Sequence, residues 1–398
     1  MAESMNGRPA RASAVCMCSS FRAAGGCECC ATVPVIRAEG EDAAPFQGSA
    51  PESAPPPPPG QFDLLVIGSG VSTAVPMLSH VLRRECSEAS TAVRRCDNLT
   101  VCEEALRNPA SKNRRHNVSV LLRCTPAEGG PTGHIMVDAG KTMRQAVMEA
   151  FPKVGADTVQ TLLVTHGHAD AILGIDDLRD LQRLEHVYDE DGTFIGYRPA
   201  QGSGPLKVVS NKDTLERIRE TFPYLCKPPE LSRPGVMMRR TLWLEMEQLE
   251  GDDASLTTAG LPVRTFPVWH GGTYVSLGFA FGRKAGGRGH PLVYISDVKD
   301  VPPKTMSWLE EVAAEGIDVL MVDALSRKGH STHFSLDDAL SFVRRLRPKR
   351  ALLVGLASCE IGDHDEVNEE LAALRTTEGL DVQLAHDGLL LPAMPVST

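Results

Sequence analysis

The sequence predicts an α+β fold in which β-sheets pack together and helices lie on the outside. From Gln61 onward, short apolar runs alternate with amphipathic stretches. Several apolar runs precede the first predicted helix, and others follow one another between Val263 and Ile295. Strands grouped in this way favour packed sheets over a regular alternation of strand and helix.

Short apolar runs and amphipathic stretches locate the individual elements. The predicted strands are Phe62–Ile67, Val118–Arg123, Ile135–Val137, Thr161–Val164, Val208–Val209, Val263–Pro267, Val275–Phe281, Leu292–Ile295, Val319–Val322, Ala351–Val354 and Val382–Leu384. The predicted helices are Thr142–Phe151, Ile172–Leu184, Thr214–Phe222, Thr305–Glu315, Leu336–Leu346 and Glu366–Arg375.

Composition divides the chain into a disordered leader rich in Pro, Ala and Ser, residues 1–60, and one folded domain, residues 61–398. Nine of the 28 prolines lie in the leader, and the run Pro55–Pro59 favours polyproline II. Up to Arg37, arginines outnumber acidic residues, which is similar to an organellar transit peptide. No apolar run approaches the roughly 18 residues of a membrane span. We expect a cytoplasmic protein, or alternatively one that the leader directs to a plastid or mitochondrion.

The formal charge of −10 disfavours attraction to nucleic acid or anionic membranes. We therefore expect a small anionic substrate as partner, with no nucleic acid and no membrane. The oligomeric state stays open, a dimer included. Scattered cysteines favour a reducing compartment.

The strongest chemical signal is His166-Gly-His168-Ala-Asp170, which directly follows an apolar run. In an extended segment, side chains at alternate positions project to one side, so two imidazoles and a carboxylate would converge. This ligand set suits Zn²⁺ or a similar divalent ion. The alternative is a polar turn whose histidines bond to backbone.

Together with further motifs, this signature resembles the metallo-β-lactamase superfamily, and in particular the eukaryotic type of its PhnP-like branch, named for a cyclic phosphodiesterase. The resemblance covers most of residues 61–398 and implies a four-layer αβ/βα sandwich with metals at one edge. The further motifs are Ile67-Gly-Ser-Gly-Val-Ser-Thr-Ala-Val-Pro76, Asn113-Arg-Arg-His-Asn117, Gly174-Ile-Asp176-Asp177, Val137-Asp138-Ala-Gly140, Val268-Trp-His270-Gly, Tyr294-Ile-Ser-Asp297, Thr332-His333-Phe and Leu384-Ala-His386-Asp387-Gly388.

The resemblance implies that His166, His168 and His270 bind a first metal. Asp297 would bridge to a second metal that Asp170 also binds. From the residues alone, a core histidine is a serious alternative for His270, and a turn cap explains Asp297 as well as a ligand role does.

The resemblance also implies that Asp138 orients the site from behind and that His333 stands beside the metals. Asp170 and His333 are the expected catalytic residues. A metal-bound hydroxide can attack phosphorus, and the departing alkoxide then needs a proton that imidazole can donate. The alternative reading of His333 is a helix cap.

Two positions depart from the fuller superfamily pattern. Ala171 follows the aspartate where many members have histidine, and Cys359 occupies the place of a metal-binding histidine. Filling of the second site would depend on Cys359, which as a thiolate is a good zinc ligand, or on His364 as the alternative. We therefore expect one tight Zn²⁺ or Mn²⁺ site and a weaker second site.

Three cysteines, Cys86, Cys96 and Cys102, lie where some relatives carry a structural zinc, but they lack a closely spaced pair. A structural zinc and free thiols are both open readings.

The leading hypothesis is a metal-dependent hydrolase, a phosphodiesterase acting on a small phosphodiester or cyclic phosphate through a metal-bound hydroxide. The alternatives are a thioester, lactone or amide hydrolase on the same fold, and a non-catalytic binding protein whose metal site has partly decayed.

Overall fold

The computed structural model describes residues 53–83, 100–200, 204–226, 244–283, 287 and 289–396. The chain divides into two units between Ala50 and Pro51. The first unit, and with it most of the predicted leader, lies outside the described residues. The second unit carries all the elements below.

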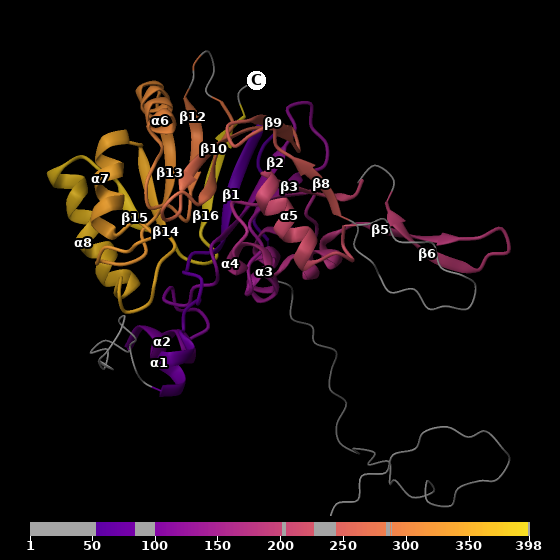
Figure 1. The fold of residues 1–398 in the computed structure, drawn as a ribbon, viewed down its shortest axis with the longest axis horizontal. Coiled ribbons are helices and arrows are strands. Elements are labelled where there is room, and N and C mark those ends of the chain that lie inside the picture. Colours follow the sequence, from indigo (N-terminus) through magenta and orange to yellow (C-terminus); the bar gives the residue numbers. More distant parts are fainter. Residues whose placement is uncertain are drawn as a thin grey trace, which may run out of the picture. The chain divides into compact units, whose positions relative to one another are not determined.

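Two seven-stranded sheets form the centre of this unit (Figure 1). The first has the order β16-β1-β2-β3-β4-β7-β8, in which β16 to β3 are antiparallel and β3 to β8 are parallel. Its strands are β1 (Gln61–Gly68), β2 (Ser119–Thr125), β3 (Gly133–Val137), β4 (Thr161–Leu163), β7 (Leu206–Ser210), β8 (Leu244–Gln248) and β16 (Leu390–Pro395).

The second sheet has the order β15-β14-β13-β12-β11-β10-β9, antiparallel from β9 to β12 and parallel from β12 to β15. Its strands are β9 (Ser255–Thr258), β10 (Leu261–Trp269), β11 (Val275–Phe281), β12 (His290–Ile295), β13 (Ile317–Asp323), β14 (Arg350–Val354) and β15 (Val382–Leu384). All eleven predicted strands overlap observed ones; the sequence missed β8, β9, β16 and a hairpin described below.

Helices cover the outer face of each sheet, so the unit has four layers (Figure 1). α3 (Met143–Ala150) and α5 (Lys212–Thr221) belong to the first sheet, and α6 (Pro303–Glu315), α7 (Leu336–Leu346) and α8 (His364–Thr377) to the second. One hydrophobic cluster fills each of the three spaces between layers. The predicted α+β, four-layer αβ/βα sandwich is therefore confirmed.

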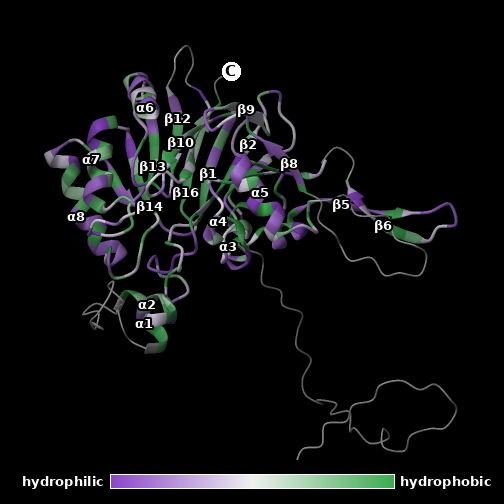
Figure 2. Ribbon diagram, in the orientation of Figure 1, coloured by the Kyte–Doolittle hydropathy of each residue, from purple (hydrophilic) through white to green (hydrophobic). Residues whose placement is uncertain are grey.

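Hydropathy follows these layers. The strands are predominantly apolar, whereas the helices carry polar residues on their exposed sides (Figure 2). Among the described residues no helix has the length and apolar character of a membrane span.

The predicted helix Ile172–Leu184 is wrong. The chain instead forms α4 (Ala169–Ile172), a 3₁₀ helix (Ile175–Leu181) and then the hairpin β5 (Leu184–Tyr188) and β6 (Phe194–Pro199). Gly174 donates to the carbonyl of Ala139, and a Cβ at this position would collide with the carbonyl oxygen of Gly140. This tertiary contact interrupts a helix that the apolar periodicity alone would have continued.

The folded unit also begins earlier than the predicted boundary at residue 61. Arg123, buried on β2, forms an ion pair with Asp63 and donates hydrogen bonds to the carbonyls of Ala54 and Pro55 at 3.1 and 2.9 Å. The start of the polyproline run thus satisfies a buried guanidinium. Its extended backbone offers carbonyls to that group.

Two short helices precede β2. They are α1 (Leu78–Arg83) and α2 (Thr100–Arg107). Val101, Cys102 and Ala105 of α2 form a small apolar cluster with Val75.

Candidate metal centre

The proposed ligands follow the ends of different strands and meet at one edge of the sandwich. His166 and His168 come after β4, His270 directly after β10, and Asp297 after β12. Asp138 follows β3. Loops at the ends of sheet strands are held by a rigid scaffold, which is why strand ends position functional groups well.

The three histidines lie together. Ligand nitrogens of His166, His168 and His270 are within 4.8 Å of one another, and the ring centroids are 4.6 to 5.1 Å apart. Burial lowers the pKa of His166 to about 3, so its imidazole is neutral near pH 7. A neutral imidazole is the form that binds a metal.

Hydrogen bonds fix which nitrogen of the His166 ring and of the His270 ring faces the centre. The Thr165 hydroxyl donates to Asp138, so it must accept from Nδ1 of His166 at 2.8 Å. Nδ1 of His270 donates to the carbonyl oxygen of Thr332 at 2.9 Å. Each ring is thereby left with an Nε2 lone pair, and the buried Nε2 of His166 has no partner within the described structure.

Asp170 lies at the centre, but the reason that we expected for its position is wrong. Only Thr161–Leu163 are strand, and Asp170 lies in the first turn of α4. Alternation along an extended segment therefore does not explain its position. The turn at Gly167 and the start of α4 do.

The two acidic residues of the centre have opposite pKa shifts. Burial and the charge of Asp297 raise the pKa of Asp170 to about 6. Burial alone would raise the pKa of Asp297 as well, but His166, His333 and His270 lower it. Oδ1 of Asp297 lies 4.0 Å from Nε2 of His166 and 3.9 Å from Nε2 of His270.

Asp138 lies behind the histidines, as expected. Its carboxylate accepts hydrogen bonds from the backbone nitrogen and the hydroxyl of Thr165, each at 2.8 Å. Asp138 is buried, and burial raises its pKa well above the ordinary value. Its contact with the centre runs through Thr165 and His166, so it orients a ligand.

His333 stands on the other side of His270, with ring centroids 4.7 Å apart. Its Nδ1 donates to Oδ2 of Asp323 at 2.7 Å, and Asp323 is completely buried. Burial opposes a charge on His333, but Asp323 together with Asp297 and Asp170 raises its pKa to about 9. The alternative that His333 caps a helix is wrong, because Ser335 caps α7.

Sequence reasoning missed Asp323, although a signal was present. Asp323 follows the apolar run Val319–Val322 and is the last residue of β13. Asp138 and Asp297 likewise follow apolar strands.

Cys359 is not brought to the three histidines, which corrects its expected role as a ligand of the second metal. Its thiol groups instead with His80 and Glu360, and Sγ lies 4.0 Å from Nε2 of His80. The other nitrogen of His80, Nδ1, lies 3.1 Å from Sγ of Cys102. Cys359 therefore lies toward α1, which carries His80. This placement depends on how the layers pack, and the position of Cys359 in the sequence does not predict it.

Of the three cysteines considered for a structural zinc, Cys102 alone is described. Cys86 and Cys96 lie outside the described residues.

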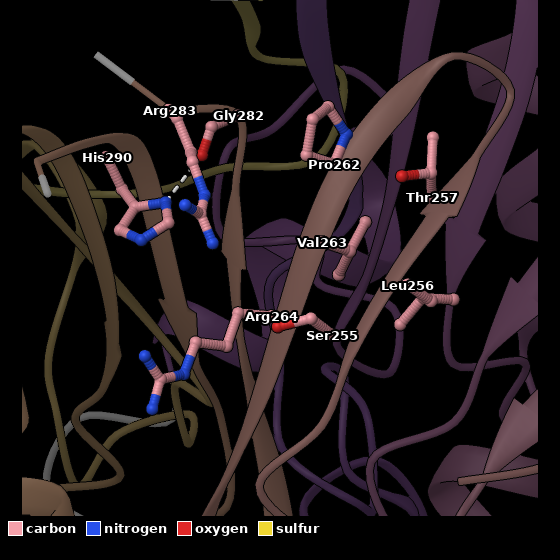
Figure 3. Close-up of a pocket in the computed structure, with 9 residues that line it drawn as sticks. All are labelled: Ser255, Leu256, Thr257, Pro262, Val263, Arg264, Gly282, Arg283 and His290. Carbon is pink, nitrogen blue, oxygen red and sulfur yellow. Dashed lines mark hydrogen bonds between the residues drawn. The ribbon is translucent and has the colours of Figure 1, made fainter. Parts of the chain in front are cut away.

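A larger cavity, of about 430 Å³, lies at the opposite ends of β10, β11 and β12. Its walls include Arg264, Arg283 and His290, whose Nδ1 bonds to the carbonyl of Gly282 (Figure 3). None of the proposed ligands lines it. The pocket at the metal centre is smaller and is lined by the loop Gly70–Ser72 together with Asp138, His166, Asp170, Asp297 and His333.

The residues present fit a divalent ion. Two donors that share one ion at about 2.1 Å each lie at most about 4.2 Å apart, and the His–Asp297 distances satisfy this limit. The unpartnered Nε2 of His166 is the kind of buried atom that a metal would satisfy.

Fold and site together define a class of proteins, metal-binding sandwiches with their ligands at one edge. Residues 134–355 match the model of the β-lactamase superfamily domain, and the chain belongs to the metallo-β-lactamase superfamily, most of whose members are hydrolases.

The solved structures that share the fold include the following two. One is a diphosphatase from the PhnP family, with 24% identity, a TM-score of 0.58, and coverage of 85% of this chain and 99% of that one. The other is zinc-bound PqqB from Methylobacterium extorquens, with 14% identity, a TM-score of 0.50, and coverage of 83% and 99%.

Among curated proteins, an octanoyltransferase from Porphyromonas gingivalis is 22% identical over 294 residues. The match takes in 74% of this chain but only 45% of the octanoyltransferase, so this chain spans less than half of that protein.

Proposed function

We propose that this protein is a metal-dependent phosphodiesterase that hydrolyses a small phosphodiester or cyclic phosphate. The observation that carries the proposal is the pair formed by His333 and the buried Asp323 beside the three histidines.

His166, His168 and His270 would hold the ion, with Asp297 as a further ligand and Asp170 toward a second ion. A bound divalent cation lowers the pKa of water and polarises a phosphoryl oxygen. Asp138 and Thr165 keep His166 in the tautomer that offers Nε2, and the Thr332 carbonyl does the same for His270.

His333 would give a proton to the departing oxygen. Because Asp323 accepts from Nδ1, the proton to be transferred is at Nε2. Asp323 also favours the protonated ring, so the donor is charged before the leaving group departs. Phosphodiester cleavage needs such a donor when the leaving group is a basic alkoxide.

Positive charge near the centre supports an anionic substrate. Lys141 and Arg217 lie close enough to act electrostatically on Asp170 and His168, respectively. Their charges would attract a phosphate despite the net charge of the whole chain.

The test is turnover of bis(p-nitrophenyl) phosphate and of a 2′,3′-cyclic nucleotide by the full chain loaded with Zn²⁺ or Mn²⁺. We expect hydrolysis that His270→Ala abolishes together with metal binding. The matched control is His186→Ala, because His186 lies exposed on the β5–β6 hairpin. Metal binding without hydrolysis of either ester would contradict the proposal and favour a binding protein.

The second candidate is hydrolysis of a thioester, with lactones and amides as related substrates. The similarity to an octanoyltransferase favours it, since that name describes transfer of an acyl group. The rates at which the same metal-loaded sample hydrolyses an octanoyl thioester and a phosphodiester decide between the two candidates. A thioester rate that exceeds the phosphodiester rate and depends on His270 would select the second candidate.

A further inference from the structure

The side chain of Arg217 lies across the loop that carries two proposed ligands. Arg217 belongs to α5, and Gly167 separates His166 from His168. A Cβ at Gly167 would lie 3.2 Å from Cγ and 3.3 Å from Cβ of Arg217. The aliphatic part of Arg217 therefore rests on the backbone between the two histidines.

The charged end of Arg217 is available to a ligand. Its side chain is 64% exposed, and its ion-pair partner Glu220, one helical turn further along α5, is 3.7 Å away and 73% exposed. Exposed pairs within a helix are weak. A substrate anion can therefore replace Glu220 at small cost.

Tyr274 completes this side of the centre. Its ring stacks on His168 with centroids 4.7 Å apart and planes 3° from parallel, and its hydroxyl accepts from the nitrogen of Gly167 at 3.3 Å. The hydroxyl would also lie 3.6 Å from a Cβ at Gly167, so Tyr274 and Arg217 meet over the same glycine. Tyr274 is 41% exposed, which leaves one part of its ring open to substrate.

We propose that Arg217 is a specificity-determining residue that binds a second anionic group of the substrate, next to the phosphoryl group at the metal centre. This inference rests on the proposed function. Arg217 lies outside the cluster of His166, His168 and His270, so its guanidinium faces atoms beyond the reacting phosphorus. A guanidinium binds phosphate and carboxylate through paired hydrogen bonds. The substrate class is thus a phosphodiester or cyclic phosphate that bears a further phosphate or carboxylate.

The test measures binding of inert probes to the zinc-loaded full chain by calorimetry. Phenylphosphonate carries the phosphoryl-like group alone, and 3- and 4-carboxyphenylphosphonate add one carboxylate at two distances. We expect at least one carboxylated probe to bind about tenfold more tightly than phenylphosphonate. Arg217→Gln should remove this advantage, lowering the affinity for the carboxylated probe about tenfold more than the affinity for phenylphosphonate, and Arg217→Lys should restore part of it.

Arg219→Gln is the matched control, because Arg219 is an exposed arginine on the same helix. An equal affinity of the unmodified protein for all three probes, or an advantage that persists in Arg217→Gln, would overturn the inference. Turnover of the nitrophenyl ester, measured separately, tests the proposed function. If the unmodified protein is inactive but the carboxylate advantage is still lost in Arg217→Gln, the proposed activity is wrong and the proposed anion site is supported.

Discussion

Nδ1 of His333 lies 2.7 Å from Oδ2 of Asp323, a carboxylate with no exposed surface at the end of β13. The second oxygen of Asp323 has no hydrogen-bond partner within the described structure. A carboxylate buried in this way is costly unless a positive charge faces it. The pair therefore fixes the orientation of the imidazole and favours its protonated form.

The first prediction concerns this pair. His333→Ala should lower turnover of an alkyl phosphodiester by about 100-fold or more, because a general acid contributes roughly that factor. The loss should be smaller for a nitrophenyl ester, whose leaving group departs without a proton. Asp323→Asn should show the same dependence on leaving group at a smaller magnitude.

Metal content, measured by elemental analysis of the same variants, provides the control. The structure also groups His333 with His270 and Asp297, so loss of metal in His333→Ala would show that His333 is a ligand.

The second prediction concerns metal stoichiometry. We expect about one tightly bound ion per chain, held by His166, His168 and His270, with a second added only at higher free metal. Ala171 offers no ligand atom, and Cys359 groups with His80 instead of with Asp170. Cys359→Ser should therefore leave metal binding beside Asp170 unchanged.

Titration with Zn²⁺ in competition with a chelator measures both affinities. Asp170→Asn is the comparison variant and should weaken the second ion. If Cys359→Ser weakened that ion as much as Asp170→Asn does, the assignment of Cys359 to the neighbouring cluster would be wrong.

The third prediction places the start of the folded unit. Removal of residues 1–52 should leave the free energy of unfolding unchanged. Removal of residues 1–60 should lower it by about 1–3 kcal/mol, because the buried guanidinium of Arg123 loses the carbonyls of Ala54 and Pro55. Urea denaturation of both truncated chains checks this, and equal stability of the two would place the boundary at residue 61 after all.

The fourth prediction concerns acid stability. Burial, assisted by the charges of Arg115 and His386, lowers the pKa of His364 to about 4 from 6.5. Below pH 6.5 the unfolded chain therefore binds a proton at His364 that the folded chain does not accept. The stabilisation is complete above pH 6.5 and is lost as the pH falls to 4, by about 3 kcal/mol in total.

Urea denaturation between pH 4 and pH 7 measures this loss. His364→Gln should make the pH profile shallower across that interval by the contribution of one group, whereas His186→Gln on the exposed hairpin serves as control. An unchanged slope in His364→Gln would remove His364 as the cause.

Much of the fold was predictable because its signals are local. Most strands of the sandwich centre are short apolar runs, and such runs are typical of buried strands. β8, β9 and the β5–β6 hairpin lack this signal, since polar or exposed residues alternate along them. At Gly174 the local signal was misleading. Apolar periodicity favoured a helix over Ile172–Leu184, but the close contact of Gly174 with Gly140 interrupts it.

The sequence by itself determined the superfamily and pointed to the histidines and to Asp138, Asp170 and Asp297 as residues of the proposed centre, because a strand followed by His-Gly-His or by an aspartate is a local pattern. Only the tertiary structure decided which of these residues face one another. Asp323 became the partner of His333, Cys359 turned toward His80, and the stem of Arg217 came to rest on Gly167. These contacts join residues from separate elements, and their geometry depends on how the layers pack, which no local pattern records.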